Sequence, residues 1–302
     1  MCIRDSILTT PYDISTATVN NTKIVFIDGG PADTQATQVV FNNDGTKMFI
    51  VNHGYQKEID YWSLTTAFDI STATHDGAFS ISGQEARANS VAFNNDGTRM
   101  FVVGAGNELQ HRIHEYSLST PFDLSSTVTH LNTEDLSSTH NYIDGVTFNY
   151  NGTKMYTIEN ETEGDNFIAQ FKLTTPYDVS TLSLEGNCDV SSHDISPREV
   201  AFSNDGSKMF FIGDDNDRVY EFNLSCNWSV IDGACDDPTD TSDGGKDISS
   251  SIESQTATAK QIAIQASTPV LNRMYWLRRH RNEDKLSNQN IKFNFSNSMM
   301  AS

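Results

Sequence analysis

The chain has 302 residues, 37% hydrophobic side chains and a net charge of −20 at neutral pH. Its length suits one repeat domain with an appendage, its hydrophobic content excludes disorder, and no run approaches the about 18 apolar residues of a membrane-spanning helix. Residues 251–302 hold seven basic and three acidic side chains, which leaves −24 for residues 1–250. That charge disfavours nucleic acid as a partner and favours either bound cations or a self-repelling, soluble surface.

The first six residues, Met1–Ser6, resemble a translated sequencing adapter and are interpreted as an artefact. From Ile7 onward the chain enters in the middle of a repeat unit. We therefore expect earlier units and a secretion signal to be missing, and the lack of a signal peptide excludes nothing.

Internal repeats dominate residues 7–235. The segment Val39–Val51 recurs in close copies, and a Leu-Thr-Thr-Pro-aromatic-Asp phrase keeps the same period. Periods of this size are typical of solenoids, propellers and arrays. The turn glycines of the four copies lie 52, 55 and 54 residues apart, at Gly45, Gly97, Gly152 and Gly206.

Each unit predicts four strands. An Asn-Asp-Gly or Asn-Gly turn between two apolar runs is typical of a β-hairpin. The second run, such as Met100–Val103, is apolar on nearly every residue, which requires a strand covered on both faces. A third strand with alternating polarity, such as Glu58–Leu64, leads to the Thr-Pro turn, and a weaker fourth strand follows.

The predicted fold is all-β, with about four to five four-stranded blades of a β-propeller-like array over residues 7–235. The motif F-N/S-N-D-G-T/S-K-M-F/Y is similar to the hairpin of propeller repeats in bacterial surface and periplasmic proteins. This resemblance implies the fold and leaves the function open, because propellers include hydrolases, lyases, lactonases and binding proteins. The number of units fits either an open arc or a closed ring of five.

Within the repeats, the Thr-Pro-aromatic-Asp phrases are interpreted as turns whose aromatic side chains fill the core. Gly213–Asp217 gathers oxygen ligands of the kind that calcium takes, so Asp214, Asp215 and Asp217 are metal candidates, with a solvated hairpin loop as the alternative. Otherwise the sequence predicts no cofactor. Neither a Gly-x-Ser-x-Gly motif nor a phosphate-binding glycine loop is present, but catalysis assembled from several blades would leave no linear motif.

Cysteines offer one candidate bridge. Cys226 and Cys235 flank a turn-rich loop where the repeats stop, and a disulfide there would fasten the last blade in an oxidising compartment. Two free thiols are the alternative. Cys188 is predicted to be a small packed residue.

Beyond Cys235 the composition changes. Residues 236–250 are a polar linker, and residues 251–302 predict a helix that begins at the Ser250-x-x-Glu253 capping box and a strand of alternating polarity at Asn290–Asn297. This last region resembles the start of the translocator unit of bacterial autotransporters. The resemblance implies a helix that threads an outer-membrane β-barrel and the barrel's first strand, with the rest of the barrel missing.

Three functions are compatible with these patterns. The first is a binding or adhesion passenger without catalysis, displayed at the surface of a Gram-negative bacterium, with an extracellular protein or glycan as ligand and the outer membrane reached through the missing barrel. The second is an extracellular hydrolase or lyase that acts on polymers with carboxylates near the propeller axis. The third is a soluble periplasmic scaffold. Clustered carboxylates at the axis would favour the enzyme over the binding module.

Overall fold

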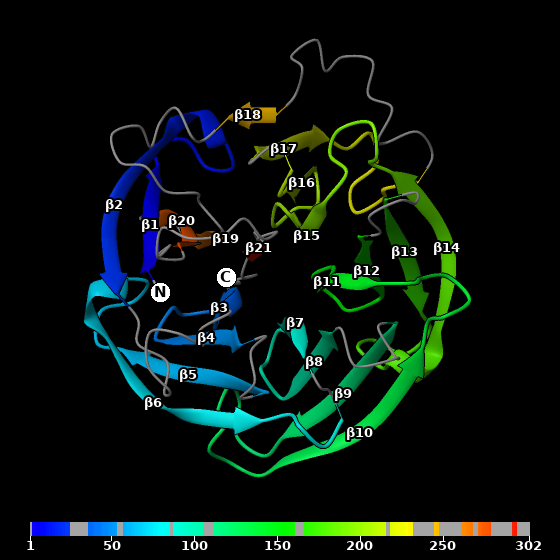
Figure 1. Ribbon diagram of the computed structural model, residues 1–302, viewed down its shortest axis with the longest axis horizontal. Helices are drawn as coiled ribbons and strands as arrows, with labels where there is room; N and C mark the ends of the chain where they lie inside the picture. Colours follow the sequence, from blue (N-terminus) through cyan, green and yellow to red (C-terminus); the bar gives the residue numbers. More distant parts are fainter. Residues whose placement is uncertain are drawn as a thin grey trace, which may run out of the picture.

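The computed structural model describes residues 2–24, 36–52, 57–84, 87–104, 111–160, 166–215 and 218–231, and strands within 245–294. Its regular elements there are β-strands and three 3-10 turns. Four antiparallel sheets of four strands each stand around a ring, as predicted for propeller-like blades (Figure 1). Among the described residues, no helix is long and apolar enough to span a bilayer.

Each repeat sheet, here called a blade, is built from consecutive strands. The inner strands β3, β7, β11 and β15 lie nearest the centre of the ring, and the outer strands lie at its edge (Figure 1). Blade 1 contains β3 (Ala36–Phe41), β4 (Lys47–Asn52), β5 (Glu58–Leu64) and β6 (Ala73–Ser80). Blade 2 contains β7 (Ala88–Phe93), β8 (Arg99–Gly104), β9 (Arg112–Leu118) and β10 (Val128–Asp135). Blade 3 contains β11 (Ile143–Phe148), β12 (Lys154–Glu159), β13 (Phe167–Leu173) and β14 (Leu182–Asp189). Blade 4 contains β15 (Pro197–Phe202), β16 (Lys208–Gly213), β17 (Arg218–Asn223) and β18 (Gly245–Asp247).

The hairpin turn of each blade combines a glycine with an aromatic residue. In blade 2, Gly97 has φ +70°, a region in which glycine carries no Cβ penalty. A Cβ at Gly97 would also overlap the ring of Phe122, which covers the turn. The following Asp123 accepts a hydrogen bond from the Ser125 backbone N–H at 2.9 Å. These contacts confirm that the Thr-Pro-aromatic-Asp phrase is a structural turn.

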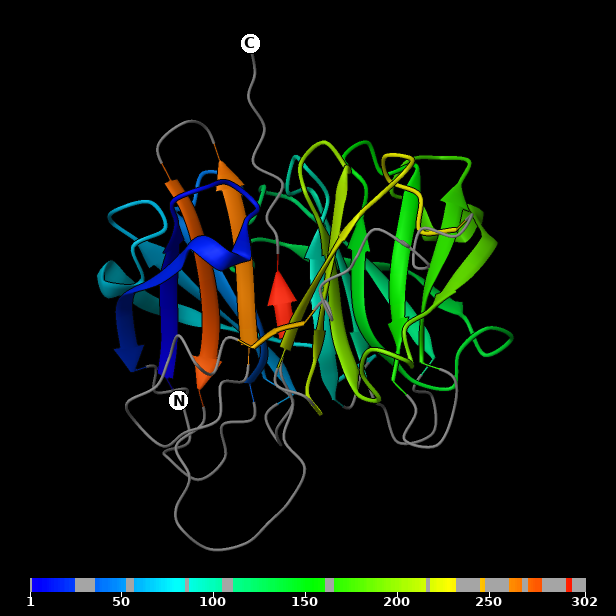
Figure 2. The same ribbon diagram turned by 90° about the horizontal axis from the view of Figure 1, so that it is seen from above.

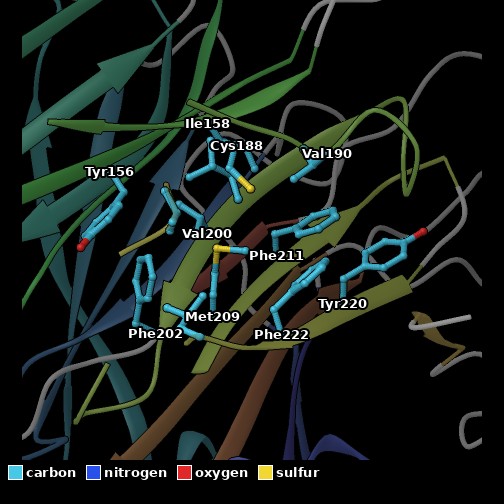
Figure 3. Packing of buried hydrophobic residues seen from close by; sticks show 13 residues of the cluster. Tyr156, Ile158, Cys188, Val190, Val200, Phe202, Met209, Phe211, Tyr220 and Phe222 are labelled. Atoms are coloured by element: carbon cyan, nitrogen blue, oxygen red, sulfur yellow. The ribbon is translucent and has the colours of Figure 1, made fainter. Parts of the chain in front are cut away.

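The second strand of each hairpin is sealed from solvent. Met48, Phe101, Tyr156 and Phe210 are all 0% exposed, which confirms that both faces of these strands are covered. Neighbouring blades pack directly through such residues. Figure 3 shows Tyr156 of blade 3 against Phe202 of blade 4, with ring centroids 4.3 Å apart. Burial between blades therefore holds the ring together.

A fifth sheet takes strands from both ends of the chain. Its order is β2-β1-β20-β19-β21, and Figure 2 shows β19 and β20 beside β1. The inner strand β21 contacts β15 and β3, so it lies between blades 4 and 1. The bounds are β1 (Cys2–Leu8), β2 (Ala17–Ile24), β19 (Gln261–Ser267), β20 (Leu271–Arg278) and β21 (Lys292–Asn294).

The N-terminal unit, which contains β1, Tyr12 and β2, contacts blade 4 in the same way as neighbouring blades contact each other. Tyr12 stacks on Phe210 of blade 4 with ring centroids 6.4 Å apart and planes at 26°, and Tyr177 of blade 3 stacks on Phe101 of blade 2 with the same two values. Lys208 donates to the Tyr12 carbonyl, as Arg99 donates to the Tyr177 carbonyl. The N-terminal unit therefore follows blade 4 as blade 3 follows blade 2, which favours the closed ring of five over the open arc.

The described parts of the C-terminal region are extended. Strands β19 and β20 occupy residues 261–267 and 271–278, where the sequence pattern predicts a helix, because β1 offers an unpaired edge that β20 fills. Residues 251–260 lie outside the described part. β21 falls within the predicted strand at 290–297, and β18 falls within the predicted linker. Cys2–Ser6, interpreted above as an artefact, belong to β1.

The cysteines differ from prediction. Cys226 is an exposed free thiol, so the bridge from Cys226 to Cys235 does not form, and Cys235 itself lies outside the described residues. Cys188 is buried, which confirms the prediction of a small packed residue, and it is also disulfide-bonded, which the sequence did not predict. β14, which carries Cys188, lies close to the chain beyond the last repeat, because a Cβ at Gly186 would meet Ile231 at 2.7 Å.

Candidate active site

Two residues on each inner strand differ from blade to blade although the surrounding repeat hardly changes. They immediately precede the Val-x-Phe sequence that starts every hairpin. We call them the axial positions. They are Thr37 and Gln38 in blade 1, Asn89 and Ser90 in blade 2, Asp144 and Gly145 in blade 3, and Arg198 and Glu199 in blade 4.

A β-bulge marks these positions in every blade. The register between the inner strand and its neighbour shifts between Ala36 and Gln38 in blade 1 and between Ala88 and Ser90 in blade 2. Blades 3 and 4 shift at the equivalent places. Because a bulge bends the strand and re-aims its side chains, bulges are common beside active sites. Here they turn the axial side chains toward other blades.

Side chains from three blades converge on the carboxylate of Glu199. Its Oε2 accepts hydrogen bonds from Gln38 Nε2 at 2.9 Å and from Ser90 Oγ at 3.0 Å, and Glu199 is 1% exposed. Gln38 Nε2 also lies 3.0 Å from Ser90 Oγ. Residues separated by up to 161 positions therefore form one buried cluster on the inner strands.

The backbone holds this cluster in place. Gln38 Oε1 accepts from the Val91 N–H at 2.6 Å, and Ser90 Oγ accepts from the Val146 N–H at 3.3 Å. Gly145, the second axial residue of blade 3, leaves room for the Glu199 carboxylate, because a Cβ there would lie 2.7 Å from Glu199 Oε1. The amide, hydroxyl and carboxylate groups are thus fixed relative to one another, as an active site requires.

A second layer surrounds Arg198, one residue before Glu199. Its guanidinium donates to Asp144 Oδ2 at 2.7 Å and to Asp214 Oδ2 at 3.0 Å. Burial lowers the pKa of Arg198, but the two carboxylates raise it more, so the net pKa is above the ordinary value. Asn160 donates to the same Asp144 oxygen at 2.8 Å. Arg198 is therefore a permanent cation whose charge is balanced within the protein.

Asn89 joins this layer from blade 2. Its Nδ2 donates to the Ile143 carbonyl and to the Tyr142 hydroxyl, both at 3.3 Å. Burial, with a smaller contribution from the Asp144 charge, raises the pKa of Tyr142 far above its ordinary value, so the phenol stays neutral. The amide orientation of Asn89 is set by these two acceptors.

The predicted metal residues take other roles. Asp214 pairs with Arg198, the Asp215 N–H donates to Asp194 Oδ1 at 3.3 Å, and Asp217 lies outside the described residues. In the part of the chain that the structure describes, no three His, Cys, Asp or Glu side chains gather in a way that could hold a metal ion. Asp214 is engaged with a cation already, so the loop geometry does not carry the calcium prediction further.

The axial cluster can perform acid–base chemistry. A carboxylate next to a hydroxyl and an amide, all buried, can accept a proton from water and return it to a leaving group. These residues form no linear sequence motif, because each blade supplies only one of them. Comparing the repeats with one another gives the missing signal, since Gln38, Ser90, Gly145 and Glu199 are unlike one another at one position of an otherwise regular repeat.

No family model and no curated protein matches the sequence. Among solved structures, the chain is similar to a protein assigned as a 6-phosphogluconolactonase from Bacteroides uniformis, with 14% identity, a TM-score of 0.47, and coverage of 70% of this chain and 59% of that one. It is also similar to the periplasmic gluconolactonase of Pseudomonas aeruginosa, with 15% identity, a TM-score of 0.42, and coverage of 69% and 56%. The chain thus spans less than two thirds of their length, and the similarity concerns the fold.

The leading functional prediction needs correction. A binding or adhesion passenger without catalysis was expected, but the similar solved structures include proteins assigned as lactonases. The buried carboxylate of Glu199, hydrogen-bonded by side chains of two other blades, is the structural observation that favours the enzyme alternative. The adhesion prediction rested on the autotransporter resemblance and on the lack of a linear catalytic motif, and neither depends on the side chains at the axial positions.

Proposed function

We propose that the protein is a hydrolase whose active site is the axial cluster, with Glu199 as general base. The observation that carries the proposal is the convergence of Gln38, Ser90 and Glu199 from three blades into one buried, hydrogen-bonded group. A cluster that served only to fill the axis could be apolar, because buried polar groups cost free energy unless they are fully paired.

In the proposed reaction, Glu199 takes a proton from a water molecule as the water oxygen attacks the carbonyl carbon of an ester or lactone. The carbon–oxygen bond to the leaving alkoxide then breaks, and the proton on Glu199 passes to that alkoxide. Gln38 and Ser90 orient the carboxylate through its Oε2. Arg198 and its two aspartates hold the bulged strand beside Glu199, which makes Arg198 a positioning residue.

Glu199→Gln tests the proposal, because the amide keeps the size of the side chain and cannot act as a base. Hydrolysis would be measured with D-glucono-1,5-lactone and with aryl esters. We expect the variant to lose about 100-fold or more in rate, the usual contribution of a general base, while its Tm stays close to that of the wild type.

Glu221→Gln is the matched control. Glu221 lies in the same blade, pairs with Lys208 and is away from the axial positions, so its variant should keep full activity. An active Glu199→Gln variant, or a wild-type protein inactive on every substrate class, would refute the proposal.

The cellular setting is a separate proposal. The resemblance of residues 252–302 to an autotransporter translocator supports export to the cell surface of a Gram-negative bacterium. The pairing of β20 with β1 gives part of this region a role in the propeller as well. The genomic reading frame tests the proposal: several further segments of alternating polarity after Ser302 would support it, and a stop codon there would oppose it.

A further inference from the structure

Among the described residues, three buried polar atoms of the axial positions have no hydrogen-bond partner. They are Thr37 Oγ1, Asn89 Oδ1 and Arg198 Nε, on residues that are 3%, 1% and 8% exposed. All three residues occupy the first of the two axial positions, directly before Gln38, Ser90 and Glu199. An unsatisfied buried polar atom costs about 1–3 kcal/mol. Three such atoms at equivalent positions of three blades therefore indicate a site that a polar group occupies.

Hydrogen bonds place Asn89 and Arg198 in one layer, and Thr37 holds the equivalent position in blade 1. Arg198 of blade 4 bonds Asp144 of blade 3, and Asn89 of blade 2 bonds the carbonyl of Ile143, the residue before Asp144. The layer therefore runs continuously through blades 2, 3 and 4, next to the carboxylate cluster.

The chemistry of the three atoms restricts what can satisfy them. Asn89 Oδ1 only accepts, because an amide oxygen carries no hydrogen, and the two bonds that Nδ2 donates fix the orientation of the amide. Arg198 Nε only donates. An anion could serve Arg198 Nε but would meet Asp144 and Asp214, which already balance the guanidinium. A cation could serve Asn89 and not Arg198. A hydroxyl group both donates and accepts, so it suits all three.

We infer that the axial site takes a neutral, polyhydroxylated ligand of the sugar or sugar-lactone class, and that Thr37 and Asn89 bind its hydroxyl groups. This inference rests on the proposed function for its location and adds the substrate class. It sets the protein apart from enzymes that act on phosphorylated sugars, because Arg198 is the only cation among the eight axial residues and is already paired.

Calorimetric titration of the full chain with D-glucose, D-galactose and their 1- and 6-phosphates tests the inference. We expect the neutral sugars to bind and the phosphates to bind at least tenfold more weakly. Thr37→Val should weaken binding of the neutral sugar about threefold to tenfold, the value of one hydrogen bond. It should not lower Tm, since the lost hydroxyl has no partner in the part of the chain that the structure describes.

Thr147→Val is the matched control. Thr147 lies on inner strand β11, at a position where the other blades carry Val40, Ala92 and Ala201, so its variant should bind like the wild type. Equal or tighter binding of the phosphates, or unchanged binding by Thr37→Val, would overturn the inference. Sugar binding without turnover of any substrate would instead support the inferred ligand class and refute the proposed hydrolase function.

Discussion

His140 shows how a single buried residue sets the response to acid. Its Nε2 lies 2.8 Å from Thr157 Oγ1, and burial, with a smaller effect of His111, lowers its pKa to about 3. The pKa of His114 is likewise lowered by burial, and further by His130 and Arg112, to about 4. Both side chains are therefore neutral in the folded protein well below the pH at which an unfolded histidine takes up a proton.

The sign of the effect follows from linkage. Below a pH of about 6.5 the unfolded chain binds protons that the folded chain excludes, so stability is complete above that value and falls as the pH drops toward 4. Each histidine contributes a slope of about 1.4 kcal/mol per pH unit. We expect His140→Gln to reduce this slope by one such contribution, measured by urea unfolding between pH 7 and pH 4.5. Parallel profiles for variant and wild type would show that His140 is not the responsible group.

At the same scale, sequence reasoning identified residues by their neighbours along the chain. From its acidic loop, Asp214 was a metal candidate with a solvated hairpin loop as the alternative, whereas it bonds Arg198 sixteen positions away. Sequence reasoning did not find Glu199, whose partners Gln38 and Ser90 lie on other blades. Contacts between blades depend on how many sheets close the ring, which the local pattern does not specify.

Among structural elements, the glycine hairpin is the one on which every blade depends. Gly97→Ala would place a side chain at φ +70° and against the ring of Phe122. The left-handed conformation alone costs about 1–2 kcal/mol, and the overlap adds to it. We expect a loss of about 2 kcal/mol or more in the free energy of unfolding, measured with urea.

Gly83→Ala is the control for that measurement. A Cβ at Gly83 meets no atom within 4 Å, so this variant should unfold within about 0.5 kcal/mol of the wild type. Equal losses in the two variants would mean that the turn geometry is not what makes Gly97 necessary.

Hairpins were predictable because their signals are local, and the C-terminal region was not. Apolar residues such as Ala263, Val270 and Leu277 recur at helical spacing, yet the described parts are strands β19 and β20. Pairing with β1 decides this conformation, and the identity of a strand's partner is tertiary information that overrides a local pattern.

For the whole molecule, closure of the ring depends on Tyr12. It stacks on Phe210 of blade 4 as Tyr177 stacks on Phe101, and its hydroxyl accepts from the Asn204 N–H at 3.1 Å. If the N-terminal unit closes the ring, Tyr12→Ala and Tyr177→Ala should lose similar free energies of unfolding, about 3 kcal/mol each. Chemical denaturation of both variants measures this. A neutral Tyr12→Ala beside a damaging Tyr177→Ala would mean that the ring is open.

The repeat period predicted the architecture of the molecule and left its function open. Regular copies such as Val91–Val103 determine the blades, but a propeller scaffold is compatible with catalysis and with binding alike. Catalysis and binding are distinguished by the side chains at the axial positions, which are the residues that differ between the repeats.

The bulge on each inner strand has a consequence for how such a protein can change its chemistry. It places two adjacent residues of each blade where they contact other blades, while the glycine turn and the sealed second strand recur in every copy. Mutations at these two residues leave the turn and the second strand unchanged. Substitutions at these residues can therefore combine hydrogen-bond donors, acceptors and charges in new ways on an unchanged scaffold. A designed library could be limited to the same positions.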